Sequence, residues 1–279
     1  MPFFKTYDKP FLIIFAALVL FGFLALASAS LGQAAKEGVS FYDYLSRQII
    51  IGLGFGGILF YLGLRLPYKL WRRLALVVFL AGLGLMFLVY VPNFGFSHGG
   101  ARRWLNFGYF FFQPVEFLKF GFIVYLSSWI ASRKEELASF EFGLAPFFVF
   151  LGIIGILLLL QPDMGSFGVI GFTALALFFI GGAKKSHLAI IIILGLLAVA
   201  LLVAIEPYRA SRFMTFINPN NDLKGSGWQL HQSLIAIGSG SILGKGLGRG
   251  IQKFDYLPEA AGDSIFAVIA EEFGFLGGF

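Results

Sequence analysis

Long apolar runs separated by short polar connections make up most of the chain up to residue 205. Seven runs are long enough to cross a bilayer, because a transmembrane helix needs about 20 predominantly apolar residues. They cover residues 11–29, 49–64, 74–91, 114–131, 144–160, 167–180 and 188–205. An eighth run begins near Ser264, and the chain ends inside it at Phe279. The pattern predicts an all-α fold, a polytopic transmembrane helix bundle with seven complete spans and the start of an eighth.

The longest polar stretch, residues 206–262, interrupts this pattern as one large loop within a single integral membrane domain of residues 1–279. A connection of this length is more often functional than a plain linker. Residues 228–237 have an amphipathic pattern, which predicts a short interfacial helix. The glycine-rich residues 238–250 that follow are interpreted either as a flexible turn or as part of a functional loop.

Composition supports the membrane class, since 58% of the residues are hydrophobic, 13% are charged and the mean hydropathy is +0.84. The chain contains no cysteine, which excludes disulfides and thiolate metal sites. A Walker-type nucleotide loop is excluded as well, because Gly246 follows Lys245 where that motif needs Ser or Thr. Nothing in the sequence indicates nucleic acid as a partner.

The basic residues of the connections predict the orientation, because short cytoplasmic loops retain Lys and Arg. With the N-terminus in the cytoplasm, ten of these residues lie inside and four lie outside. We therefore expect a cytoplasmic N-terminus and an extracytoplasmic loop at 206–262.

Polar residues at the membrane boundary gather on the predicted outer side. Arg103 and Trp104 there are either an interfacial anchor or a group that binds an anion. Glu116 and Lys119 are three residues apart on one helix face, so they either neutralise each other or direct a phosphate toward Lys119.

Carboxylates also stand at two predicted helix starts on this side. Asp163, two residues after Gln161, and Asp263 either cap the exposed N–H groups of the following helix or take part in chemistry.

Glu271 and Glu272 lie in an otherwise apolar helix, where charge is costly enough to need a purpose or a partner. Lys119 is one candidate partner. Taken together, basic groups and carboxylates beside an apolar bundle suit a lipid pyrophosphate, with Arg103, Lys119 or Lys253 at the phosphates and a carboxylate that accepts a proton.

Five motifs resemble those of the SEDS family, and its division-type members more than its elongation-type members. They lie at residues 100–104, 113–119, 161–166, 228–236 and 252–274. The last, with Gln-Lys at 252–253, Leu-Pro-Glu at 257–259 and Glu-Glu at 271–272, is the most specific.

The resemblance implies a peptidoglycan glycosyltransferase that polymerises lipid II on the outer face of the bacterial cytoplasmic membrane in cell division. It also implies a class B penicillin-binding transpeptidase and other division membrane proteins as partners, and leaves open a divalent cation, Mg²⁺ or Mn²⁺, at the leaving group. Asp263 falls on the catalytic aspartate of the family. The residues expected to bind substrate are Arg103, Trp104, Glu116, Lys119, Gln161, Asp163, Lys253 and Glu272. A lipid II flippase and a non-enzymatic division scaffold are the alternative functions.

Three departures from the family pattern qualify the resemblance. Ala261, Gly262 and Ser264 surround Asp263 where the family has His-Thr-Asp-Phe, and Val115 replaces a serine beside Glu116. The family has ten spans, so we expect this sequence to be a fragment or a shortened gene product.

Overall fold

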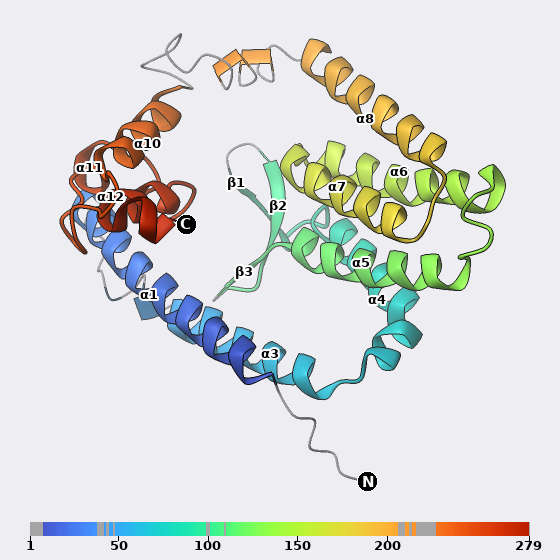
Figure 1. Ribbon diagram of the computed structural model, residues 1–279, viewed down its shortest axis with the longest axis horizontal. Helices are drawn as coiled ribbons and strands as arrows, with labels where there is room; N and C mark the ends of the chain where they lie inside the picture. Colours follow the sequence, from blue (N-terminus) through green and yellow to red (C-terminus); the bar gives the residue numbers. More distant parts are fainter. Residues whose placement is uncertain are drawn as a thin grey trace. The chain divides into compact units, whose positions relative to one another are not determined.

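The computed structural model describes residues 8–37, 42, 45–46, 48–98, 101–108, 110–205, 210–211, 214–215 and 227–278, and most of them are helical (Figure 1). The chain divides into two compact units. The first contains Met1–Tyr61 and Leu201–Phe279, and the second contains Leu62–Ala200.

The first unit joins N-terminal helices to the elements near the end of the chain. Its elements are α1 (Lys9–Glu37), the π-helical η1 (Gln48–Phe55), most of α3 (Gly56–Arg65), α10 (Trp228–Ser239), α11 (Gln252–Asp255) and α12 (Ile265–Gly278). Helix α1 contacts both α11 and α12, and α10 packs against α12. The small core of the unit is therefore built from segments more than 200 residues apart in the sequence. It contains Ala29, Ala236, Leu257, Ala260, Ala267 and Val268.

The second unit contains most of the remaining spans. Its elements are α4 (Tyr68–Leu88), β1 (Gly95–His98), β2 (Ala101–Asn106), β3 (Phe111–Phe112), α5 (Pro114–Ser132), η2 (Phe140–Leu144), α6 (Ala145–Leu160), α7 (Met164–Ile180) and most of α8 (Lys185–Ile205). Helices α4 and α5 approach closely at glycines, since a Cβ at Gly82 would lie 3.1 Å from Leu118. Phe122, Phe147 and Phe178 fill the core.

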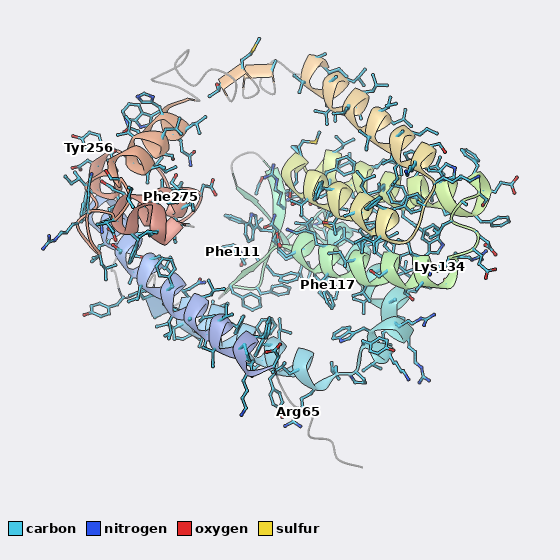
Figure 2. All side chains as sticks on the ribbon, in the orientation of Figure 1. Arg65, Phe111, Phe117, Lys134, Tyr256 and Phe275 are labelled. Atoms are coloured by element: carbon cyan, nitrogen blue, oxygen red, sulfur yellow. The ribbon has the colours of Figure 1, made fainter. Side chains whose placement is uncertain are left out.

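The predicted membrane spans are confirmed. Six described helices are long and apolar enough to cross a membrane, and the 17-residue α7 supplies the seventh predicted run. Many apolar side chains point away from the helices, while Arg65 and Lys134 lie at helix ends (Figure 2). This distribution suits helices surrounded by lipid, because apolar surface then needs no protein cover.

Helix boundaries differ from the predicted runs where charged residues continue a helix. Helix α4 begins at Tyr68, directly after Pro67, although the predicted run begins at residue 74. The first turns of α4 contain Lys69, Arg72 and Arg73, which a search for apolar residues leaves out. The residue before a helix can be proline without loss of a helical hydrogen bond, so Pro67 fixes the start.

A three-stranded antiparallel sheet between α4 and α5 is the main departure from the predicted all-α fold. In its register Phe96 is opposite Trp104, and Leu105 is opposite Phe112. Leu105 is fully buried and fixes β2 on the unit. The sequence did not reveal these strands because they are only two to six residues long.

Candidate functional site

The sheet places Arg103 against the turn between α6 and α7. The Nε of Arg103 donates to the carbonyl of Gln161 at 2.9 Å, and Nη2 donates to the carbonyl of Pro162. Carbonyls at the C-terminal end of a helix lack intrahelical donors, so the guanidinium supplies the hydrogen bonds that these two carbonyls after α6 would otherwise miss. Arg103 therefore ties the sheet to this turn, a role that the sequence did not indicate.

The same turn holds Gln161 and Asp163, both of which are buried. The Gln161 Nε2 donates to the Met86 carbonyl of α4 at 3.3 Å. Asp163 is the N-cap of α7, since its carboxylate accepts from the Ser166 N–H at 3.1 Å and from the Ser166 hydroxyl at 2.8 Å. The capping interpretation of Asp163 is confirmed.

Glu116 and Lys119 form the intrahelical pair that their spacing predicts, with 2.8 Å between Oε2 and Nζ. The Glu116 side chain is 57% exposed and that of Lys119 is 24% exposed, so water reaches the pair. Trp104 is half-buried on β2. A contact of Trp104 or Lys119 with substrate stays a prediction.

Asp263 differs from Asp163, although both precede a helix. Its side chain is exposed and has no hydrogen-bond or ion-pair partner among the described residues. Helix α12 begins two residues later, and the carbonyls of Gly262 and Ser264, not the Asp263 carboxylate, bond its first N–H groups. The capping interpretation of Asp263 is therefore wrong.

The segment before Asp263 is an ordered turn. The Glu259 carbonyl accepts from the N–H groups of Gly262 and Ser264 at 3.0 and 3.1 Å. Ser264 is buried, and its hydroxyl accepts from Gln229 of α10 at 3.2 Å. The residue next to Asp263 is thereby held, although the His and Thr of the family motif are missing.

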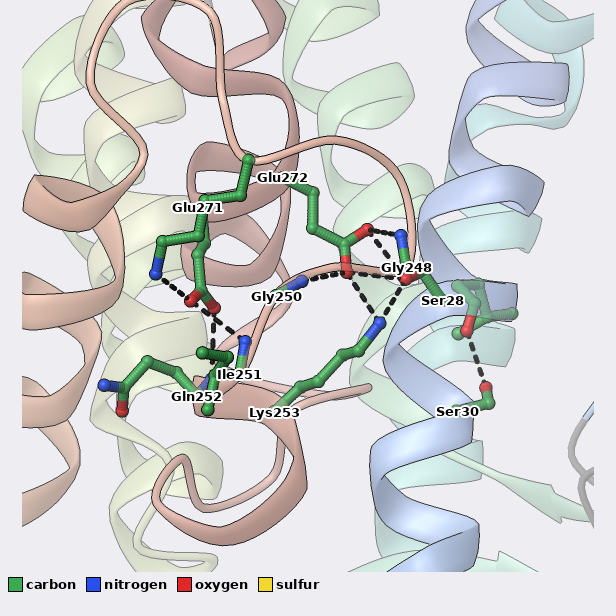
Figure 3. Close-up of polar contacts among 11 residues, drawn as sticks. Ser28, Ser30, Gly248, Gly250, Ile251, Gln252, Lys253, Glu271 and Glu272 are labelled. Atoms are coloured by element: carbon green, nitrogen blue, oxygen red, sulfur yellow. Dashed lines mark hydrogen bonds and ion pairs between the residues drawn. The ribbon is translucent and has the colours of Figure 1, made fainter.

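A buried ion pair joins the loop to α12. The Lys253 Nζ lies 2.6 Å from the Glu272 Oε1, and the two residues are 0% and 1% exposed. The Ser28 hydroxyl of α1 lies within 2.8 Å of both carboxylate oxygens and 2.6 Å from the Lys253 Nζ (Figure 3). This burial does not support the direct substrate contacts predicted for Lys253 and Glu272.

Glu271 has a separate partner. Its Oε1 lies 2.7 Å from the Lys245 Nζ, and its carboxylate accepts from the N–H groups of Ile251 and Gln252 (Figure 3). The ionic partners of both glutamates are thus lysines of the loop, whereas Lys119 pairs with Glu116.

The glycine-rich segment is packed against α12, so its interpretation as a flexible turn is wrong. The N–H groups of Gly248 and Gly250 donate to the Glu272 carboxylate at 3.0 and 3.4 Å. Gly244 has a φ of +78°, and a Cβ there would overlap the Glu272 carbonyl. Glycine is needed at Gly244 both for the backbone conformation and for this close approach.

The structure thus collects the predicted residues into two groups, one in each unit. The second unit holds Arg103, Trp104, Glu116, Lys119, Gln161 and Asp163, and the first holds Lys253, Asp263 and Glu272. Sequence reasoning missed Ser28, because a small hydroxyl in an apolar helix is ordinary. Among the described residues no three His, Cys, Asp or Glu side chains gather into a metal site, and a divalent cation stays a prediction.

Fold and site together define a multi-pass helical membrane protein in which loop residues 245–253 bond two glutamates of α12, one of them through a fully buried ion pair. The chain belongs to the cell cycle protein family of FtsW, RodA and SpoVE, whose model matches residues 9–279.

Relatives and solved structures agree with this assignment. The chain is 39% identical over 272 residues to the probable peptidoglycan glycosyltransferase FtsW of Idiomarina loihiensis, covering 97% of this chain and 66% of that protein. It is 37% identical to the protein of the same name from Coxiella burnetii, covering 98% and 73%. The rod shape determining protein RodA of Thermus thermophilus superposes with a TM-score of 0.62 at 28% identity, covering 99% of this chain and 70% of that one. A chain of a peptidoglycan synthase complex gives 0.64 at 29% identity, covering 92% and 71%.

Proposed function

We propose that this chain is a peptidoglycan glycosyltransferase that polymerises lipid II on the outer face of the cytoplasmic membrane during cell division. Its family membership and the names of its FtsW relatives support the class of reaction. The chain spans about two thirds of the length of the Idiomarina loihiensis relative, so the activity of the whole protein is part of the proposal.

The state of Asp263 is the observation that supports a catalytic role best. Four other carboxylates near the predicted boundary are already engaged, namely Glu116, Asp163, Glu271 and Glu272. Asp255 and Glu259 of the same loop are exposed as well, so the family motif, in which Asp263 falls on the catalytic aspartate, selects among the exposed carboxylates. The Asp263 carboxylate is exposed and has no partner in the described part of the chain. A general base must be able to reach the proton it takes, and an engaged carboxylate cannot do so without losing its bonds.

In the proposed reaction Asp263 takes the proton of the 4-hydroxyl on the acceptor N-acetylglucosamine. The acceptor oxygen forms a bond to the anomeric carbon of the donor muramyl sugar, while the bond from that carbon to the pyrophosphate oxygen breaks. Undecaprenyl pyrophosphate leaves with the electron pair, and the proton passes from Asp263 to water. A single displacement of this kind inverts the anomeric carbon.

Arg103 and Lys119 are the proposed contacts of the lipid phosphates, and Trp104 and Glu116 are proposed to line the same surface. Each of these four side chains is at least partly exposed. Gln161 and Asp163 are proposed to act indirectly, by holding the turn that Arg103 bonds, because both side chains are buried there. The proposed partner is a class B penicillin-binding transpeptidase, in keeping with the solved relative from a peptidoglycan synthase complex.

The test is polymerisation of labelled lipid II in liposomes that contain the full gene product and its transpeptidase. Asp263→Asn keeps the size of the side chain and removes the base. Asp255→Asn is the matched control, because Asp255 is an exposed aspartate eight residues earlier on the same loop. We expect glycan strands from the parent and from Asp255→Asn, and a rate lower by about 100-fold or more from Asp263→Asn.

Each other outcome has a distinct meaning. Equal rates from the parent and a folded Asp263→Asn variant would refute Asp263 as the base. Transfer of lipid II between leaflets without polymer would favour the flippase. Equal rescue of a division-defective strain by the parent, Asp263→Asn and Asp255→Asn would favour the scaffold.

A further inference from the structure

The Ser28 hydroxyl of α1 lies between the two charges of the buried pair of Lys253 and Glu272. Among the described residues of α1, Ser28 alone forms a hydrogen bond with this pair. Its Oγ lies 2.8 and 2.7 Å from the two Glu272 oxygens and 2.6 Å from the Lys253 Nζ. One hydroxyl can donate one hydrogen and accept another, so Ser28 donates to the carboxylate and accepts from the ammonium. We infer that Ser28 is a positioning residue that holds the Asp263 segment on α1, an inference that rests on the proposed function of Asp263.

Burial makes the three-residue contact important. Ser28 is 4% exposed, and the two charged groups are almost completely buried. A buried ion pair is favourable only when further hydrogen bonds satisfy its remaining donors and acceptors. Gly248 and Gly250 supply such bonds from the loop, and Ser28 supplies them from α1.

The pair brackets Asp263 in the sequence. Lys253 precedes it by ten residues and Glu272 follows it by nine. Between these two anchors, Leu257 and Ala267 pack in one cluster with Ala29, the residue next to Ser28. Since the Asp263 side chain has no partner among the described residues, its place depends on how this segment is held.

Backbone packing on α1 supports the same conclusion one turn further along. A Cβ at Gly32 would overlap the Lys253 carbonyl, so the loop lies directly on the helix surface. Close van der Waals packing of this kind depends only weakly on orientation. The Ser28 hydroxyl adds a contact that fixes orientation, because hydrogen bonds prefer angles above about 150° and weaken steeply below about 120°.

Ser30 provides a matched control on the same helix. It is 1% exposed, and its hydroxyl bonds to the Leu26 carbonyl of α1 itself at 2.7 Å (Figure 3). Ser30→Ala therefore removes the same atom from the same helix, and the hydrogen bond that it loses lies within α1. Ser28→Ala removes the link between α1 and the ion pair.

The experiment uses the absence of cysteine from the chain. Ala260 is 3% exposed and belongs to the cluster that contacts α1, so Ala260→Cys introduces one buried thiol near Asp263. Its reaction with a water-soluble maleimide reports how often the segment leaves α1. We expect Ser28→Ala to raise the labelling rate by about tenfold or more, because it removes hydrogen bonds to charged groups, and Ser30→Ala to leave the rate within about twofold.

Polymerisation by the same two serine variants, without the cysteine, supplies the second measurement. A positioning residue that does not touch substrate should lower kcat while the KM for lipid II stays within about twofold. Unchanged labelling in Ser28→Ala, or an equal increase in Ser30→Ala, would overturn the inference. If Ser28→Ala raises labelling and Ser30→Ala does not, but the parent makes no polymer, the docking role of Ser28 is supported and the proposed function is refuted. Failure of the inference and failure of the proposed function are therefore distinguishable.

Discussion

Replacing Lys253 with methionine should destabilise the first unit strongly. Methionine keeps much of the length of the side chain but removes the ammonium that lies 2.6 Å from both Glu272 and Ser28. Glu272 is 1% exposed, so its carboxylate would remain buried without its counter-charge. Breaking a buried pair by removing one partner costs about 3 to 5 kcal/mol. Part of this cost is offset where the carboxylate keeps the N–H groups of Gly248 and Gly250.

The double variant Lys253→Met with Glu272→Gln separates charge from packing. In the double variant neither charge remains, and the amide of Gln at position 272 can still bond Ser28 and the glycine N–H groups. We therefore expect the double variant to recover about half or more of the free energy of unfolding that Lys253→Met loses. Lys119→Met is the exposed comparison. Its pair with Glu116 is reached by water, and its loss should cost at most about 1 kcal/mol.

The assay is reversible unfolding of the purified protein in mixed detergent micelles, which gives a free energy of unfolding for each variant. Circular dichroism before the titration checks that the helices are present. A Lys253→Met variant within about 1 kcal/mol of the parent would refute the reasoning, because that is the range of exposed pairs. A double variant less stable than Lys253→Met would show that packing, not the unpaired charge, decides the effect.

Two further changes test how local elements are held. Asp163→Ala removes the N-cap of α7 and should lower the free energy of unfolding by about 0.5 to 2 kcal/mol. Asp163→Ser should lower it less, since serine is also a good cap, and equal losses in the two variants would argue against capping. Gly244→Ala should prevent the loop from packing on α12, because its Cβ would overlap the Glu272 carbonyl, whereas Gly248→Ala, with a similar φ of +78° and open space, should cost only about 1 kcal/mol. Limited proteolysis of the loop compares these glycine variants, and equal cleavage would contradict the packing argument.

Several features of this protein follow from the sequence alone. The apolar runs predicted all seven spans, because lipid requires a continuous apolar helix of fixed length and this leaves a local signal. The amphipathic residues 228–237 likewise predicted α10. The spacing of Glu116 and Lys119 predicted their ion pair, since residues three apart face each other on any helix.

The tertiary structure decided everything that depends on distant partners. Asp163 and Asp263 both precede a helix, but different contacts hold the two helix starts. Asp163 caps its helix through Ser166 in the same turn, whereas beside Asp263 the Ser264 hydroxyl accepts from Gln229, 35 residues away. The sequence indicated that Glu272 needs a partner, but Lys253 and Ser28 are 19 and 244 residues away from it. Local patterns report the environment of a residue, whereas the choice among possible partners depends on how the chain folds back on itself.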